Sequence, residues 1–178
     1  PELVELQKHW PAIRDEALAQ AQRDGTLQRN FQGYSTHGDC DIIGLGVSAI
    51  GRIGETYTQN ARDLIGYHAA LDAGRLPVMR GLALDQDDRL RREVINALMC
   101  HGQVDMQQCS LQHGFVFAEY FREELERLQD LARDGLLTMD ERMLRVTARG
   151  RLLLRNVAMC FDAYLGRDAS SVRFSRAI

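Results

Sequence analysis

Hydrophobic residues recur at helical spacing through the second half of the chain. Asp85 and Asp88 have the spacing of a helix-capping pair, and the predicted helix behind them has one apolar face made of Leu90, Val94, Ile95, Leu98 and Met99. We predict a short helix over residues 105–112 and a third over 115–134, with inward-facing Phe117, Phe121, Leu125, Leu128 and Leu131. A hairpin over 136–146 and a last helix from Thr147 to about Leu165 complete a winged-helix-like order.

The first half of the chain alternates between short apolar runs and glycines. Residues 41–43 are predicted to be a buried strand, and Asn60 is expected to cap a helix that Gly74 ends. The segment 76–84 should be extended, with a domain boundary near Arg80. Two short helices are predicted at the start of the chain, the second ended by Gly25. The pattern as a whole indicates an α+β fold that is mainly helical.

The segment 30–50 concentrates glycines and polar groups in a short span. Glycines at 44 and 46 leave a backbone with little side-chain bulk, which a small molecule can approach closely. The spacing Gly44-x-Gly46-x-x-Ala49, with Asp63 further on, also satisfies a dinucleotide-binding fingerprint. We reject that interpretation because Gly51 would interrupt the helix that must open there. The alternative is a bulged strand whose glycines only let two backbones pack together.

Composition and charge are those of an ordinary globular domain. The 178 residues are 45% hydrophobic and 26% charged, with a net charge of -3, so the total charge favours neither nucleic acid nor a membrane. No apolar run approaches the roughly 20 residues of a membrane span. The four scattered cysteines do not form a disulfide framework, which favours a reducing cytoplasm. We expect a cytoplasmic monomer that binds neither nucleic acid nor membranes.

Nucleic-acid binding is the rival function that the winged-helix-like order raises. Five arginines cluster in the predicted wing and last helix: Arg142, Arg145, Arg149, Arg151 and Arg155. The third helix, which would read the groove, instead carries Glu119, Glu123, Glu124 and Glu126. Because these acids would repel phosphates, we favour protein packing, with the arginines paired to the acids or bound to a neighbouring domain.

Cysteines and histidines offer two weak metal candidates. Cys109 and His113 lie four residues apart, as two ligands on one helix face can, and Cys100-His101 lies nearby. Gly114 predicts a helix end beside this pair, and buried cysteines with surface histidines would explain the same residues without a metal. The group of His37, Cys40 and Asp41 is similarly weak. We therefore assign no metal site and no catalytic residue to this chain.

A series of phrases resembles a known family over most of the chain, from about Asp15 to Ile178. The phrases are Ala21-Gln22-Arg23-Asp24-Gly25, Asn30-Phe31-Gln32-Gly33-Tyr34-Ser35-Thr36, Gly44-Leu45-Gly46-Val47-Ser48-Ala49-Ile50, Gln59-Asn60, Arg80-Gly81-Leu82-Ala83-Leu84, Gly150-Arg151-Leu152-Leu153-Leu154-Arg155-Asn156 and Phe174-Ser175-Arg176-Ala177-Ile178. In this order they resemble the C-terminal portion of oxygen-independent coproporphyrinogen III oxidase, a radical S-adenosylmethionine (SAM) enzyme of haem biosynthesis. Residues 1–14 are not covered and weakly resemble the start of aspartyl/asparaginyl β-hydroxylase-like proteins, which suggests a fusion segment.

The resemblance implies a cofactor role for two residues. Gln32 and Ile50 match the family residues that contact a second SAM molecule. The family's 4Fe-4S cluster needs three closely spaced cysteines, whereas this chain has only Cys40, Cys100, Cys109 and Cys160, so we expect no cluster on it. A catalytic barrel is therefore expected upstream as a partner, and coproporphyrinogen III is the implied substrate. The chain is not expected to be active alone.

The implied domain organisation has three parts. Residues 1–27 would be N-terminal helices, 28–80 the end of the radical SAM barrel, with strands around 28–50, and 81–178 a helical domain with one hairpin. Arg29, Arg52 and Arg80 are our candidates for contacts with substrate carboxylates, because a guanidinium group matches a carboxylate in bidentate fashion. Their closeness in sequence to the glycine-rich stretch is the motive for this hypothesis.

Overall fold

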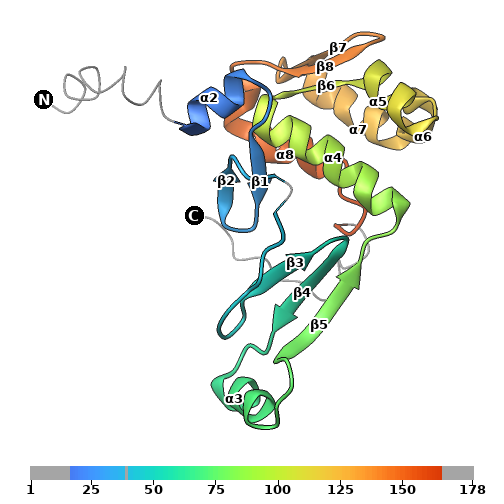
Figure 1. Cartoon of the computed structure of the whole chain (residues 1–178). Helices are drawn as coiled ribbons and strands as arrows, with labels where there is room; N and C mark the ends of the chain where they lie inside the picture. Colours follow the sequence, from blue (N-terminus) through green and yellow to red (C-terminus); the bar gives the residue numbers. More distant parts are fainter. Residues whose placement is uncertain (1–16, 39, 166–178) are drawn as a thin grey trace, which may run out of the picture. The chain divides into compact units, whose positions relative to one another are not determined.

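The computed structural model describes residues 17–38 and 40–165, which belong to two compact units divided between Leu90 and Arg91 (Figure 1). Each unit combines helices with a small antiparallel sheet, so the predicted mixture of helices and strands is confirmed. The predicted helix within residues 1–14 and the closing phrase 174–178 lie outside the described residues. Within the described part of the chain, no helix has both the length and the apolar character that a membrane span requires.

The first unit contains a hairpin, a three-stranded sheet and two helices before α4. These elements are α2 (Ala17–Arg23), β1 (Gln28–Asn30), β2 (Gly33–Ser35), β3 (Ile50–Ile53), β4 (Thr56–Asn60), α3 (Leu64–Asp72) and β5 (Val78–Ala83). Strands β1 and β2 pair with each other, while β3, β4 and β5 form an antiparallel sheet in that order. Helix α2 is followed by Gly25 with a positive φ of 72°, as the sequence predicted. Helix α4 (Gln86–His101) begins in this unit and continues in the second.

Two local predictions for this unit are wrong. Residues 41–43 do not form a strand, since only an isolated bridge joins Ile42 to Arg52. Gly46 has a φ of 101° and Ser48 a φ of 59°, and these left-handed conformations turn the backbone away from an extended path until β3 begins at Ile50. Asn60 is not a helix cap, because it is the last residue of β4.

The helix after β4 begins three residues later than predicted. Asp63 is its N-cap, and the Asp63 carboxylate accepts a hydrogen bond of 2.6 Å from the backbone N–H of Gly66. The predicted end of this helix at Gly74 is confirmed, since Gly74 has a φ of 65° and its N–H donates to the Leu71 carbonyl. The extended segment that follows is also confirmed as β5.

The second unit consists mainly of helices around a three-stranded sheet. Its elements after α4 are β6 (Gln103–Asp105), α5 (Met106–His113), α6 (Phe117–Tyr120), α7 (Arg122–Arg133), β7 (Leu137–Met139), β8 (Met143–Val146), the 3-10 helix η1 (Gly150–Leu153) and α8 (Leu154–Met159). The sheet has the order β6-β8-β7 with antiparallel pairing throughout. The predicted hairpin is therefore confirmed, while β6 was not predicted because three residues are too few to show a period.

Capping explains where α4 and α5 begin and where α5 ends. The N–H of Asp85 donates to the carboxylate of Asp88 at 3.1 Å, and the N–H of Asp88 donates back to Asp85 at 2.9 Å, which confirms the predicted capping pair. Asp105 caps α5 by accepting from the N–H of Gln108 at 2.8 Å. Gly114, with a φ of 70°, follows the last residue of α5.

Two long helices of the prediction are shorter in the structure. The predicted third helix divides at Phe121 into α6 and α7, because Phe121 leaves helical geometry with a φ of -101° and a ψ of 30°. The last predicted helix becomes η1 and α8, which ends at Met159 instead of about Leu165. Thr147 still caps the start of this segment, since its hydroxyl oxygen accepts from the N–H of Gly150 at 3.0 Å.

Aromatic side chains form the centre of the second unit. Phe117, Phe121 and Phe161 are almost completely buried, and the Phe121 ring lies 4.7 Å from that of Phe117 and 5.3 Å from that of Phe161 between centroids. Further buried side chains around them are Val94, Leu98, Leu128, Leu137, Leu144 and Val157. These residues come from α4, α7, α8 and the sheet, so one core joins all these elements.

Replacing Phe121 by alanine should strongly destabilise the second unit. The change removes a fully buried ring and leaves a cavity between two other rings, which costs about 3–5 kcal/mol of unfolding free energy. Chemical denaturation followed by circular dichroism measures this cost. Leu152→Ala is the matched control, since Leu152 is 87% exposed and its loss should change stability by less than about 0.5 kcal/mol. Equal effects of the two substitutions would contradict the assigned core.

Candidate functional site

The glycine-rich loop of residues 44–48 is held in place by the buried side chain of Asn60. The Asn60 amide donates hydrogen bonds to the carbonyl oxygens of Gly44 at 3.0 Å and Gly46 at 2.9 Å. The hydroxyl of Tyr67 on α3 accepts a bond from the Gly46 N–H at 3.1 Å, and the Ser48 N–H donates to the Ala61 carbonyl at 2.7 Å. The end of β4 and helix α3 therefore fix the loop from two sides.

Glycines are needed here because backbones come into contact. A Cβ atom on Gly44 would lie 2.8 Å from the carbonyl oxygen of Ile50, and one on Gly51 would lie 2.9 Å from that of Ile42. The chain passes from Ala49 directly into β3, so no helix opens where the dinucleotide fingerprint requires one. The rejection of that fingerprint is confirmed, and the loop has the close backbone packing of the alternative interpretation.

The two residues expected to contact SAM both lie in the first unit. Gln32 lies in the turn between β1 and β2, where its backbone N–H donates to the Asn30 side chain at 2.8 Å. Ile50 is the first residue of β3 and is 37% exposed. Phe31, next to Gln32, packs edge-on against Tyr57 of β4 with ring centroids 5.1 Å apart.

This aromatic contact relates the two predicted residues to each other. Tyr57 pairs with Arg52, which lies two residues along β3 from Ile50. The turn that carries Gln32 is therefore attached to the sheet that carries Ile50. Within the described part of the chain, the Gln32 side-chain amide has no hydrogen-bond partner and is exposed, so it remains able to donate and accept.

The three candidate arginines have different surroundings. One Nη of Arg52 donates to the carbonyl oxygens of Gly38 at 3.2 Å and Cys40 at 3.1 Å, which gives this side chain a structural role in the preceding loop. Arg80 is exposed, and its Nε donates to Gln59 at 2.8 Å. Arg29 is exposed and lies over the Tyr34 ring at 5.9 Å. Arg29 and Arg80 therefore present the more accessible guanidinium groups.

Asn60 and Tyr67 are the residues of this region that the sequence did not reveal as important. The phrase Gln59-Asn60 was part of the family resemblance, but the helical pattern downstream made a cap the more obvious role for Asn60. Its real partners are carbonyl groups 14 and 16 residues earlier in the chain. A contact of that sequence separation leaves no local periodic signal.

Two of the five clustered arginines pair with acids other than the glutamates that the sequence suggested. Arg142 pairs with Asp105 at 2.8 Å and Arg145 with Asp140 at 3.3 Å, rather than with the glutamates of α7. These acids are nearer because Asp105 and Asp140 lie beside the same sheet as the two arginines. Glu124 of α7 instead pairs with Arg91 of α4 at 2.8 Å and with Arg127 of its own helix at 3.2 Å.

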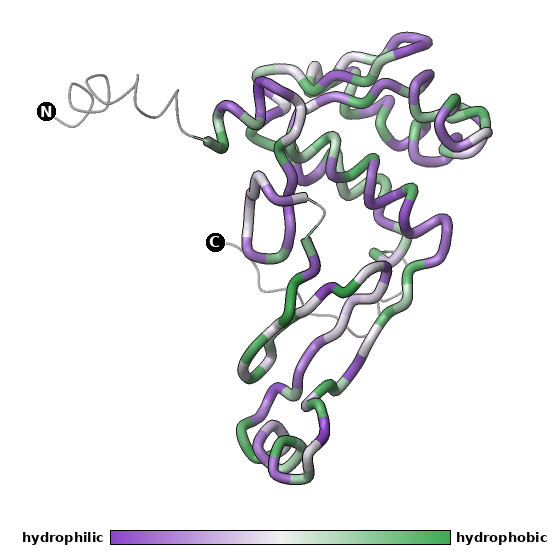
Figure 2. The backbone as a smooth tube through the Cα atoms, viewed as in Figure 1, coloured by the Kyte–Doolittle hydropathy of each residue, from purple (hydrophilic) through white to green (hydrophobic). Residues whose placement is uncertain are grey.

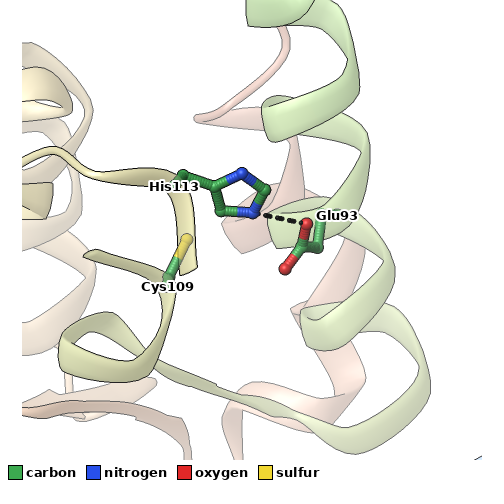
Figure 3. Close-up of side chains that lie close together, drawn as sticks. All are labelled: Glu93, Cys109 and His113. Carbon is green, nitrogen blue, oxygen red and sulfur yellow. Dashed lines mark hydrogen bonds and ion pairs between the residues drawn. The ribbon is translucent and has the colours of Figure 1, made fainter. Parts of the chain in front are cut away.

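The metal candidates are only partly brought together. Cys109 and His113 share a face of α5 and lie beside Glu93 of α4, which the sequence did not suggest (Figure 3). Cys100 is buried and donates to Asn96 at 3.3 Å. Among residues 17–38 and 40–165, no group of three potential ligands other than Glu93, Cys109 and His113 comes this close together, so His37, Cys40 and Asp41 do not form one.

Comparison with known proteins relates this chain to one enzyme. A family model described as the HemN C-terminal domain matches residues 84–153. The chain is 50% identical over 164 residues to the oxygen-independent coproporphyrinogen III oxidase of Salmonella typhimurium and 49% identical to that of Escherichia coli strain K12. Each alignment covers 92% of this chain and 36% of the relative, so the chain spans about a third of the length of these proteins.

A solved structure has the same fold as well as a similar sequence. It is described as "Coproporphyrinogen III oxidase (HemN) from Escherichia coli is a Radical SAM enzyme", and the similarity has a TM-score of 0.82 at 49% identity. It covers 85% of this chain and 35% of that chain. Sequence and fold therefore agree over the same large part of the molecule.

Replacing Asn60 by alanine should release the glycine-rich loop. The change leaves the Gly44 and Gly46 carbonyl groups without these two bonds, at a cost of about 1–3 kcal/mol in unfolding free energy. Limited proteolysis should then cleave near Leu45, which is 85% exposed, faster than in the unchanged protein. Gln112→Ala, an exposed change on α5, is the control and should leave the cleavage rate unchanged. An unaltered rate in the Asn60 variant would show that other contacts fix the loop.

Proposed function

We propose that this chain, which is similar in sequence and fold to the C-terminal part of oxygen-independent coproporphyrinogen III oxidase, works as one portion of such an enzyme. The observation that carries this proposal is the combination of about 50% identity with a TM-score of 0.82. In such an enzyme, SAM held by a 4Fe-4S cluster supplies the radical chemistry that oxidatively decarboxylates coproporphyrinogen III to protoporphyrinogen IX. Our chain would supply part of the second SAM site and cover the substrate.

The first unit is proposed to be the end of the radical SAM barrel. Its own buried apolar side chains before α4 are few: among the described residues they are Ala21, Leu27 and Ala70. In contrast, the side chains of Leu45, Ile65 and Leu76 are more than 80% exposed. Many of the residues that lead into β3 are hydrophobic (Figure 2). A surface of this kind typically marks a contact with another protein part. We infer that residues 28–80 pack against an upstream barrel in the complete enzyme.

Gln32 and Ile50 are proposed to bind the second SAM. The exposed Gln32 amide can donate to and accept from polar groups of a nucleoside-like ligand, while Ile50 offers partly exposed apolar surface. The loop of residues 44–48 has the low side-chain bulk that lets a ligand approach the backbone. These two residues thus fit the cofactor chemically, with the Asn60 contacts keeping the neighbouring backbone in one conformation.

The cluster itself would be held elsewhere. Cys40 is exposed, Cys100 and Cys109 are buried, and Cys160 is half-buried, each in a different part of the chain. No two of them are close enough in sequence to form the cysteine-rich loop that a 4Fe-4S cluster requires. The chain would therefore depend on an upstream barrel for the radical, and we place the assembled enzyme in the reducing cytoplasm as a monomer.

Substrate recognition is proposed to involve exposed arginines of the first unit. Coproporphyrinogen III carries carboxylates, and a guanidinium group binds a carboxylate with two parallel hydrogen bonds. Arg29 and Arg80 are the better candidates, since Arg52 already donates to two backbone carbonyls. The role of Arg52 would be to hold the loop that precedes the glycine-rich segment.

The second unit, residues 91–165, is proposed to be a winged-helix-like cover. The order α4, β6, α5, α6, α7, β7, β8, with β8 central in the sheet, supports this arrangement. Helix α7 carries Glu123, Glu124 and Glu126, which disfavour contact with phosphates. Because Arg142 and Arg145 of the hairpin are paired with acids, we favour protein packing over DNA binding. Residues 81–90 would connect this cover to the barrel end.

A chimeric enzyme tests the proposal directly. In the Escherichia coli relative, the matching C-terminal part is replaced by this chain, and anaerobic conversion of coproporphyrinogen III is followed with SAM and a reductant. We expect the chimera to be active and the separate chain to be inactive. A chimera that folds, as judged by circular dichroism and its bound iron, yet has no activity would contradict the proposed role. A salt-dependent shift of duplex DNA by this chain would favour the rival function.

Substitution of the two proposed cofactor residues should weaken SAM binding in that chimera. Gln32→Ala removes hydrogen bonds to a charged ligand, for which a loss of roughly tenfold to a hundredfold in affinity is expected. Ile50→Asp should have a similar or larger effect because it places a charge on an apolar contact. Equilibrium dialysis with labelled SAM should show two SAM molecules bound to the unsubstituted chimera and one bound to each of the two variants. Gln112→Ala is the control, and a stoichiometry of two in both variants would refute the assignment.

A further inference from the structure

Three potential metal ligands converge between two helices of the second unit. Glu93 comes from α4, while Cys109 and His113 come from α5, where their spacing of four residues places them on one face (Figure 3). The carboxylate, thiol and imidazole atoms all lie within 4.8 Å of one another. Helix α5 continues through His113 before Gly114 ends it, so the predicted helix end does not separate the pair.

We propose that Glu93, Cys109 and His113 form a binding site for a zinc ion. The site uses none of the residues assigned above to SAM or substrate, and it lies within the second unit alone. The inference therefore does not rest on the proposed enzyme function.

The distances require only small movements of the side chains. In a tetrahedral zinc site, bonds of about 2.0–2.3 Å place neighbouring ligand atoms roughly 3.3–3.6 Å apart. His113 Nε2 and Glu93 Oε2 are now 2.9 Å apart, joined by a hydrogen bond. A zinc ion would replace the proton between these two atoms and widen their separation slightly. The Cys109 sulfur, which lies at most 4.8 Å from each of them, would move closer. Rotation about side-chain bonds covers changes of this size.

The ligand types select the metal. One sulfur, one imidazole nitrogen and one carboxylate oxygen form a mixed set that suits Zn²⁺, whereas Mg²⁺ and Ca²⁺ prefer oxygen alone. Three protein ligands leave a fourth position for water or a further ligand. Helices α4 and α5 supply these ligands from regular backbone, which makes the positions of their Cα atoms well defined.

The proposed zinc site is buried on the side of Cys109 and open to solvent on the side of His113 and Glu93. Cys109 is only 5% exposed, so its sulfur is protected from solvent. The side chains of His113 and Glu93 are 34% and 49% exposed, so an ion can enter from solution and retain water at its fourth position. The centroid of the Phe115 ring lies 6.2 Å from that of the His113 ring.

The thiol must lose its proton when the ion binds. Burial, and secondarily the negative charge of Glu93, raises the pKa of Cys109 to about 11, so the free site carries a thiol at neutral pH. Formation of the zinc–sulfur bond releases that proton to solvent. The Glu93 charge that opposes ionisation of the thiol in the free site would then be bound to the cation.

The alternative is an ordinary hydrogen bond between Glu93 and His113 beside an inert buried thiol. Titration of the complete 178-residue chain with Zn²⁺ in competition with a chromophoric chelator separates the two. We expect one bound ion, no binding of Mg²⁺, and at least a tenfold weaker zinc affinity in Cys109→Ser, His113→Ala and Glu93→Gln. Cys160→Ser and His68→Ala are the controls, because neither residue belongs to the cluster, and they should bind as the unchanged chain does.

A spectroscopic measurement covers the case in which a variant fails to fold. Co²⁺ bound to the unchanged chain should show a thiolate-to-metal absorption band that Zn²⁺ removes and that persists in Cys160→Ser. Absence of this band in the unchanged chain would overturn the proposal. Equal zinc affinity in the folded Glu93→Gln variant and the controls would overturn it as well, since Glu93 is partly exposed and its amide analogue preserves the side-chain shape.

Discussion

The ion pair of Arg91 and Glu124 is the interaction on which the second unit depends. Arg91 Nη1 donates to the Glu124 carboxylate at 2.8 Å and to the carbonyl oxygen of Phe161 at 3.1 Å, and its guanidinium lies 5.4 Å from the Phe121 ring centre. A single side chain of α4 thus contacts α7, the aromatic core and the segment after α8. Because the Glu124 side chain is only 8% exposed, its buried charge requires cationic partners, which Arg91 and, at 3.2 Å, Arg127 of the same helix supply.

The two units are stabilised in different ways. The second has a continuous aromatic and aliphatic core, whereas the first is ordered mainly by hydrogen bonds to the glycine-rich loop and by close backbone packing. Asn60 in the first unit resembles Arg91 in the second, since each side chain binds groups that are distant from it in sequence. The difference agrees with our proposal that the first unit completes its core only against another part of the enzyme.

The sequence predicted those features that depend on local chemistry. The capping pair Asp85 and Asp88, the end of α5 at Gly114 and the hairpin of β7 and β8 follow from residues close together in the chain, and each is confirmed. Contacts between distant segments were missed. Strand β6 forms because it pairs with β8 some 40 residues later in the chain. Asn60 was expected to cap a helix, but its side chain instead binds the carbonyl groups of Gly44 and Gly46, which precede β3.

The candidate sites follow the same division. The sequence placed Cys109 and His113 on one helix face, but Glu93 is 16 residues before Cys109 and only its tertiary contact with His113 reveals it. Family resemblance is the basis on which we propose a cofactor role for Gln32 and Ile50, which no periodicity would single out. The contact of Phe31 with Tyr57, which attaches the turn bearing Gln32 to the sheet, also depends on tertiary structure.

The placement of charges in the second unit has a consequence for its response to ionic strength. Dissolved ions screen exposed pairs over a distance of about 10 Å at 0.1 M but act much less on buried ones. The pairs of the sheet, Arg142 with Asp105 and Arg145 with Asp140, have exposed arginines, whereas Arg91 with Glu124 is covered. Concentrated salt therefore weakens the outer edge of the sheet while leaving the junction of α4 and α7 almost unaffected.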